Sequence, residues 1–186
     1  MKIKFIILVF SIFIPLNCSF AEVIQFERYR NEEYKFQINK PKEWIAIDKQ
    51  HYTQLFSQMQ LQDPRGTVIC TFIKDPNINS PPLVTVGLLF HQEQVSIEEY
   101  LKALNAVVKN DENIIEKPKI INLGDRKVIK YTARMIQPIV YRIVIAETYL
   151  FFEGNNIFNV GALADLEEYE SVKQMFKEIV TSFNSL

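Results

Sequence analysis

The chain has 186 residues, with 21 lysine and arginine residues against 22 aspartate and glutamate residues and a formal net charge of −1 at pH 7. This balance argues against general nucleic-acid binding, which depends on clustered positive charge. The length suits one domain whose core buries about 70% of the unfolded surface.

The N-terminal segment has the three parts of a cleavable secretory signal peptide. Two lysines precede an apolar run of 12 residues, 5–16, shorter than the ~20 residues that a membrane-spanning helix needs. The small residues Ser19 and Ala21 stand at the two positions that signal peptidase reads. We therefore expect cleavage between Ala21 and Glu22, leaving residues 22–186 as a single periplasmic or secreted domain without a transmembrane span.

The first of the two cysteines offers an alternative, in which a lipid is attached to Cys18 and anchors the protein. Lipoprotein processing prefers a leucine three positions earlier and a small residue immediately before, whereas Pro15 and Asn17 occupy those positions. Cleavage after Ala21 would leave Cys70 alone. Because it lies in an apolar stretch, we expect Cys70 to be a small buried hydrophobic residue and no disulfide to form.

Apolar and polar residues alternate along much of the chain, a pattern that predicts eight strands. The predicted strands span residues 23–28, 34–39, 67–73, 83–92, 114–122, 126–135, 139–152 and 157–163. Short connections with turn-forming residues at 123–125 and 153–156 indicate that the last four strands form an antiparallel meander.

Two amphipathic helices follow recognisable N-terminal signals. Ser96 and Glu99 form a capping box before the first helix, and Asp165 and Glu168 repeat that pattern before the terminal helix. The apolar stripe of the terminal helix comprises Tyr169, Val172, Phe176, Ile179, Val180 and Phe183. A shorter helix is expected near residues 52–59. Both long helices should pack against the sheet, so the predicted fold class is α+β.

The two ends of the predicted domain bear packing motifs of a known fold. Near the start stands the motif Tyr34-x-Phe36-x-Ile38-x-x-Pro41-x-x-Trp44, and near the end residues 157–162 lead into a helix that closes with residues 179–183. Together these resemble the PsbP-like superfamily, which also includes the Mog-type Ran-binding proteins and the DcrB-type bacterial envelope proteins. The resemblance covers residues 22–186 and implies an antiparallel β-sheet sandwiched by α-helices, with Trp44 in the core.

The resemblance implies no particular reaction, because members serve as accessory subunits of the photosynthetic oxygen-evolving complex, as a partner of a nuclear GTPase and as envelope proteins. The sequence itself contains neither a Gly-x-Ser-x-Gly nor a Gly-x-Gly-x-x-Gly motif. A zinc site needs three or four ligands, and the two histidines, His51 and His91, lie far apart in the chain. We therefore expect no catalytic residues, no metal site and no cofactor.

The most informative surface lies on the hairpin after residue 125. If Gln137 and Pro138 form a tight turn, even positions of one strand share a face with odd positions of the next. That face would combine Arg126, Lys130 and Arg134 with Tyr141, Ile143, Ile145, Glu147 and Tyr149. The opposite face is predicted to belong to the core. It would combine Ile129, Tyr131, Ala133 and Met135 with Val140, Val144 and Ala146. A three-residue loop would exchange the two faces.

The simplest interpretation of this charged face is a solvated surface with an ion pair between Lys130 and Glu147. The alternative hypothesis is a binding site. In that case Arg126, Lys130 and Arg134 would receive an anionic ligand or an acidic partner surface, with Tyr141, Glu147 and Tyr149 beside them.

These observations lead to one expected function and two alternatives. We expect an exported, non-enzymatic binding or accessory module of the bacterial cell envelope, whose partner is an unidentified envelope protein or small ligand. The alternatives are a carrier domain for a small ligand and a periplasmic hydrolase whose catalytic residues are dispersed in the sequence.

Overall fold

The structure is a computed structural model, and it describes residues 24–48, 66–74, 81–90, 94–137 and 142–186. The predicted signal peptide, the cysteine considered for lipidation and the cleavage site lie outside the described residues. So do the short helix expected near residues 52–59, both histidines and Tyr141.

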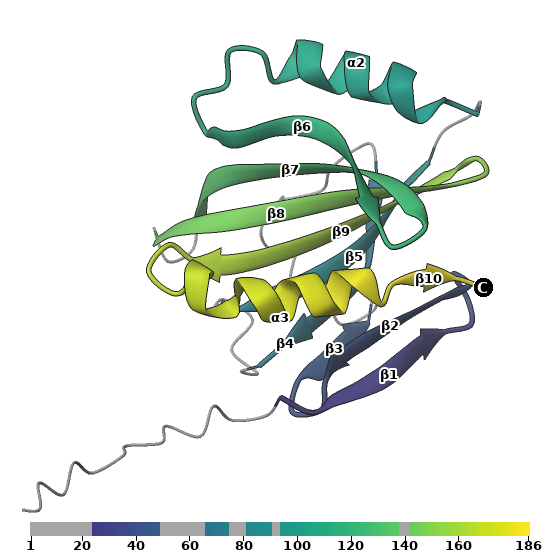
Figure 1. The fold of residues 1–186 in the computed structure, drawn as a ribbon. Coiled ribbons are helices and arrows are strands. Elements are labelled where there is room, and N and C mark those ends of the chain that lie inside the picture. The colour runs from purple at the N-terminus through teal and green to yellow at the C-terminus, as the bar shows by residue number, and fades with distance from the viewer. Residues whose placement is uncertain (1–23, 49–65, 75–80, 91–93, 138–141) are drawn as a thin grey trace, which may run out of the picture.

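The described residues form ten strands and two helices (Figure 1). In chain order the elements are β1 (Phe26–Asn31), β2 (Phe36–Pro41), β3 (Ile45–Asp48), β4 (Gly66–Ile73), β5 (Leu83–Phe90), α2 (Ile97–Val107), β6 (Ile114–Leu123), β7 (Arg126–Gln137), β8 (Arg142–Glu153), β9 (Asn156–Asp165), α3 (Tyr169–Thr181) and β10 (Asn184–Ser185). Neither helix in this part of the chain is long and apolar enough to cross a membrane.

Seven strands form one antiparallel sheet in the order β3-β4-β5-β9-β8-β7-β6. The last four strands are an antiparallel meander, as the turn residues predict. Gly124 and Gly154 adopt φ of 62° and 61° at two of its turns, a conformation that glycine reaches without steric cost. A second sheet, with the order β1-β2-β10, joins the two ends of the described chain.

The two helices cover opposite faces of the large sheet. Adjacent residues of a strand point to opposite faces. Val128 of β7 belongs to the core cluster that contains the buried residues of α3. The next residue, Ile129, belongs to a second cluster, against which side chains of α2 pack. Figure 1 shows α3 lying across the sheet and α2 beside β6. The predicted α+β fold, an antiparallel sheet sandwiched by helices, is therefore confirmed.

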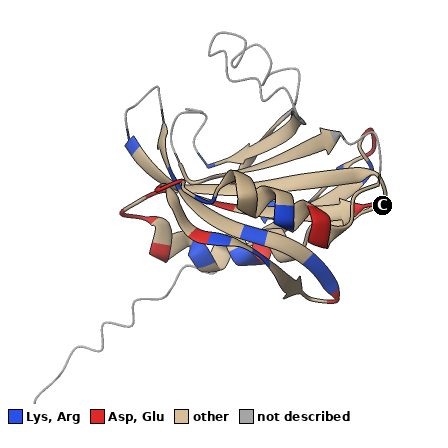
Figure 2. Ribbon diagram, turned by 90° about the horizontal axis from the view of Figure 1, so that it is seen from above, with Lys and Arg blue, Asp and Glu red and all other residues tan. Residues whose placement is uncertain are grey.

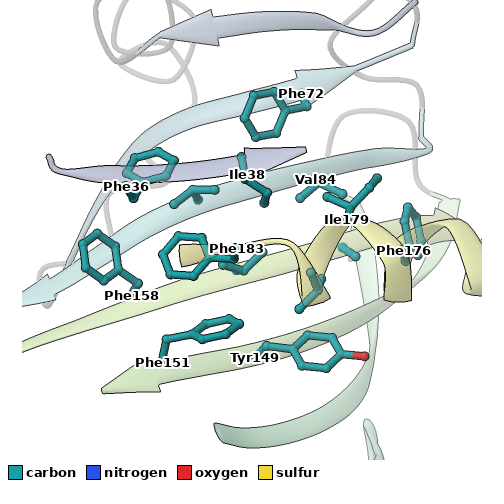
Figure 3. Close-up of a cluster of buried hydrophobic side chains, with 14 of the residues drawn as sticks. Phe36, Ile38, Phe72, Val84, Tyr149, Phe151, Phe158, Phe176, Ile179 and Phe183 are labelled. Atoms are coloured by element: carbon teal, nitrogen blue, oxygen red, sulfur yellow. The ribbon is translucent and has the colours of Figure 1, made fainter. Parts of the chain in front are cut away.

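Aromatic rings fill the core between the large sheet, the small sheet and α3 (Figure 3). The ring of Phe183 lies 4.6 Å from that of Phe151, 5.3 Å from that of Phe158 and 5.6 Å from that of Phe36, measured between centroids. Such ring pairs add roughly 0.5–1.5 kcal/mol each beyond the area that they bury. Trp44 is buried in the same cluster, which confirms its predicted core position.

The two predicted capping boxes have different outcomes. Before α2, the hydroxyl of Ser96 accepts a hydrogen bond from the amide of Glu99, whose carboxylate accepts one from the amide of Ser96. Before α3 the prediction is wrong, because Asp165 is the last residue of β9 and its carboxylate accepts from Arg142. Glu168 is the N-cap of α3 and makes no capping hydrogen bond through its side chain.

Candidate functional site

The pairing of β7 with β8 determines which side chains share a face. β7 continues through Gln137, which pairs with Arg142, so Gln137 belongs to the strand and not to the tight turn considered for residues 137–138. The register nevertheless keeps even positions of β7 opposite odd positions of β8, with Lys130 facing Tyr149. Because directly opposed residues point to the same side of a sheet, the shared face is confirmed for the predicted residues of β7 and β8 that the structure describes, which leaves out Tyr141.

The charged face is nevertheless not a solvated surface where it passes beneath α3. Glu147 is 1% exposed and Tyr149 is 3% exposed, and the side chain of Lys130 is 16% exposed. The opposite face is also covered, as predicted, except at its end, where Met135 is 49% exposed. The interpretation of the Lys130 and Glu147 region as solvated is therefore wrong, because helices cover both faces.

A polar cluster, which we call the Glu147 cluster, lies between the sheet and α3 and is buried around Glu147. Its members are Glu116, Lys130, Thr132, Glu147, Tyr149 and Tyr169. Glu147 Oε1 accepts hydrogen bonds from Lys130 Nζ, at 3.1 Å, and from the hydroxyl of Tyr169. Glu147 Oε2 accepts from the hydroxyl of Tyr149 at 2.8 Å. Three donors from β7, β8 and α3 thus satisfy this carboxylate.

The second carboxylate of the cluster lies on the edge strand β6. Lys130 Nζ stands 3.5 Å from Glu116 Oε2, and the hydroxyl of Thr132 donates to the same oxygen at 3.1 Å. Burial opposes the ionisation of Glu116, but the positive charge of Lys130 and the hydrogen bond from Thr132 outweigh it, so the pKa of Glu116 is lowered. The ammonium group of Lys130 therefore contacts the carboxylates of both Glu116 and Glu147.

The two phenols of the cluster act as hydrogen-bond donors and keep their protons. Burial first, and then the negative charge and hydrogen bond of Glu147, raise the pKa values of both Tyr149 and Tyr169. Lys130 Nζ also lies 5.6 Å from the centre of the Tyr149 ring, within the range of a cation–π contact. The cluster therefore joins the first turn of α3 to strands β7 and β8 of the sheet.

The other predicted site residues lie apart from the cluster. The guanidinium of Arg126 stands 4.9 Å from the centre of the Phe151 ring and donates to the carbonyl of Phe183, while burial lowers its pKa. Arg134 is exposed. The two arginines are eight positions apart on β7, about 27 Å at the rise of a strand. One small anion cannot contact both, and the anion-binding hypothesis stays a prediction for an extended partner.

The sequence interpretation missed an exposed apolar row at the end of the sheet, which we call the apolar row. Ile136 of β7 pairs with Ile143 of β8, and the amide of Leu166, just after β9, donates to the carbonyl of Ile143 at 3.2 Å. These three side chains are 67%, 43% and 47% exposed in that order. Isolated exposed aliphatic residues are common, but neighbouring ones rimmed by polar residues are typical of interaction sites.

A pocket of about 490 Å³ adjoins the apolar row. It is lined by Arg142, Ile143, Asp165, Leu166, Glu167 and Glu168. Arg142 Nη1 donates to Asp165 Oδ2 at 3.3 Å across the floor formed by β8 and β9. The lining of the pocket therefore combines two aliphatic side chains with three carboxylates and one guanidinium. No group of three or more metal-ligating side chains occurs among the residues that the structure describes.

Charge is mixed over the rest of the molecule. Figure 2 shows lysine and arginine interspersed with aspartate and glutamate over the described ribbon. Nucleic-acid binding draws on a continuous basic surface, and the described part of the chain has no such surface.

Comparisons with known proteins identify the fold. No family model matches the sequence, and no curated protein matches it. The solution structure of PsbP from the cyanobacterium Synechocystis matches with a TM-score of 0.52 and 13% identity, covering 91% of this chain and 97% of that one. A crystal structure from Bacteroides thetaiotaomicron matches with a TM-score of 0.55 and 10% identity, covering 88% of this chain and 49% of that one.

A third structure, the Ran-binding protein Mog1p of Saccharomyces cerevisiae, matches with a TM-score of 0.46 and 10% identity, over 87% of this chain and 96% of that one. The chain has a PsbP-like fold, which confirms the resemblance seen in its packing motifs. At such low identity the similarity concerns the fold alone.

Proposed function

We propose that this protein is an exported, non-enzymatic binding or accessory module of the bacterial cell envelope. The apolar row supports this proposal more than any other observation. Ile136, Ile143 and Leu166 form a continuous exposed line across three neighbouring segments, next to a pocket with charged walls. A hydrophobic centre surrounded by a polar rim is the usual anatomy of a protein interface.

The burial of Glu147 supports the non-enzymatic part of the proposal. A general acid or base must come within hydrogen-bonding distance of the substrate proton that it transfers. Glu147 is 1% exposed, and both of its oxygens already accept hydrogen bonds from neighbouring side chains. Its three partners are better explained as supports for α3 than as catalytic groups.

The export part of the proposal rests on the predicted signal peptide. The N-terminal mass of the protein isolated from its host tests it directly. A mature chain that begins at Glu22 is the expected result, whereas a lipid-bearing Cys18 would mean membrane anchoring. A chain that retains all its N-terminal residues in the cytoplasm would contradict export.

Site-specific photo-crosslinking in the native host tests the binding function. A benzoyl-phenylalanine placed at Ile143 is expected to capture one defined envelope protein. The same group at Val107 of α2, which is 74% exposed and lies on the other side of the sheet, serves as the matched control. Identical crosslinks from both positions, or turnover of a substrate by the purified protein, would contradict the proposal.

The pocket favours a second candidate, a carrier of a small ligand. Its volume of about 490 Å³ lies within the range of small-molecule sites, about 300–1,000 Å³. Native mass spectrometry of the protein from its own host would then show a retained ligand mass. That mass should disappear on unfolding.

A further inference from the structure

The apolar row and the pocket beside it form one surface with an uneven charge distribution. Ile143 and Leu166 belong to both features. Glu167 and Glu168 follow Leu166 directly, are exposed, and have no ion pair among the described residues. An apolar contact made here therefore places the neighbouring groups of the bound molecule beside two unneutralised carboxylates.

The pocket lining is negative overall. Its three carboxylates, on Asp165, Glu167 and Glu168, face one guanidinium, on Arg142, so the formal charge of the lining is −2. Arg142 reaches only Oδ2 of Asp165, and Oδ1 is shielded from water without a hydrogen-bond partner in the described part of the chain. A carboxylate oxygen shielded from solvent adds negative potential that water screens poorly.

The N-terminus of α3 offsets part of this charge. A helix N-terminus acts as roughly half a positive charge, and the carboxylates of Glu167 and Glu168 stand at the start of α3. The offset is smaller than the formal charge of −2 on the lining. The surface on the β9 side of the apolar row therefore stays acidic.

The β7 side of the apolar row has the opposite sign. Arg134 is exposed and lies two residues before Ile136, so both side chains point to the same face. Arg134 has no ion pair among the residues that the structure describes. The charges thus give the surface a direction, acidic beside Leu166 and basic beside Ile136.

We infer that this surface docks a segment of a partner protein in which aliphatic side chains stand next to a lysine or arginine. This inference rests on the proposed function as a binding module and adds the chemistry of its partner. The aliphatic side chains cover Ile143 and Leu166, and the cation lies beside Glu167 and Glu168. An anionic membrane surface fits less well, because these carboxylates would repel its headgroups.

Selection from a library of random short peptides tests the inference. The purified protein is immobilised, and binders to the variant with both Ile143→Asp and Leu166→Asp are first removed. The expected survivors have aliphatic residues beside lysine or arginine. Enrichment of neutral or acidic peptides, or no enrichment, would overturn the inferred partner chemistry.

Charge variants then locate the peptide. Glu167→Lys combined with Glu168→Lys is expected to weaken binding of the selected peptide about tenfold, the effect of reversing two exposed charges. The matched control combines Glu98→Lys, in the first turn of α2, with Glu178→Lys, about 15 Å further along α3. Equal weakening by the control pair would mean nonspecific attraction and would overturn the inference.

The same variants separate the failure of this inference from failure of the proposed function. If crosslinks from Ile143 to a defined partner persist while lysine and arginine are absent from its bound segment, the binding function stands and the partner chemistry is wrong. If crosslinks and peptide binding are both absent, both proposals fail. Binding to vesicles of phosphatidylglycerol, or a dimer in sedimentation that Ile143→Asp dissociates, would instead identify a membrane or a second copy and overturn the inference.

Discussion

The carboxylate of Glu147 in β8 accepts a hydrogen bond from the hydroxyl of Tyr169, the first residue of α3. This contact ties the helix to the middle of the sheet at a place where α3 has no side-chain cap of its own. Removing the hydroxyl leaves a buried carboxylate with one donor fewer. We therefore expect Tyr169→Phe to lower the free energy of unfolding by about 1.5–3 kcal/mol.

Urea unfolding measures this loss, and amide hydrogen exchange in α3 shows whether it is local to the helix. Tyr131→Phe is the matched control, because the hydroxyl of Tyr131 makes no hydrogen bond in the described part of the chain. A Tyr169→Phe variant as stable as the control would mean that the cluster does not hold α3.

The raised pKa values of Tyr149 and Tyr169 predict a loss of stability in alkali. Both phenols stay protonated in the folded protein while tyrosine ionises in the unfolded chain near its ordinary pKa of about 10. Their contribution is therefore complete below about pH 10 and falls as pH rises, with a slope of at most about 1.4 kcal/mol per pH unit for each phenol. Tyr169 is partly exposed, so its contribution to this loss of stability is smaller than that of Tyr149.

Urea midpoints between about pH 8 and 11 test this dependence, together with tyrosinate absorbance. The variant with Tyr149→Phe and Tyr169→Phe should show a shallower decline than the unmodified protein. An equally steep decline in that variant would assign the alkaline loss to other groups.

Phe183 is the residue whose truncation should cost the most in the core. It is fully buried and contacts the rings of Phe36, Phe151 and Phe158. Phe183→Ala leaves a cavity among residues from both sheets and should lower the free energy of unfolding by about 3–5 kcal/mol. Leu186→Ala, three positions later at an exposed site, should stay within about 0.5 kcal/mol. Similar losses in the two variants, read from thermal unfolding, would contradict this assignment.

Cys70 should be inert toward thiol reagents in the folded protein. It is fully buried on β4, and burial raises the pKa of its thiol, whereas the thiolate is the reactive species. Mass spectrometry of the peptide that contains Cys70 should show alkylation by iodoacetamide only after unfolding. Rapid alkylation without denaturant would mean that β4 opens readily.

The strands of the meander could be predicted because apolar and polar residues alternate along them, and this alternation indicates which residues share a face. The side-chain period of a strand is two, so a register shift by an even number of residues leaves the faces unchanged. The observed register differs from a turn at residues 137–138, yet Lys130 still shares a face with Glu147 and Tyr149. Face composition was therefore predictable from the sequence even though the register was not.

Burial of the charged face could not be predicted in the same way. Alternating polarity normally means one buried and one solvated face, but helices cover both faces here, and Val144, Glu147 and Leu150 of β8 are all buried. The sequence predicts a surface position for Glu147. Its carboxylate can be buried only because three separate elements supply hydrogen-bond donors, and the local sequence pattern does not show them. Only the tertiary structure brings those donors together.

Elements stabilised by distant partners also escaped prediction. β3 has four residues and β10 has two, and each exists through pairing with a strand elsewhere in the chain. At the start of α3 the pattern of Asp165 and Glu168 suits a capping box, but pairing with Val144 holds Asp165 in β9. The apolar row was missed because its exposure depends on where α3 stops covering the sheet.

The contact between β10 and β2 has a consequence for the timing of folding. Leu186 donates its amide to the carbonyl of Lys35, and Phe183 completes the aromatic core around Phe36. On the ribosome, β2 emerges early, while Phe183 is added only after all seven strands of the large sheet have been synthesised. A nascent chain therefore lacks this part of its core until synthesis of the domain is nearly finished, and we expect it to stay loosely folded until then.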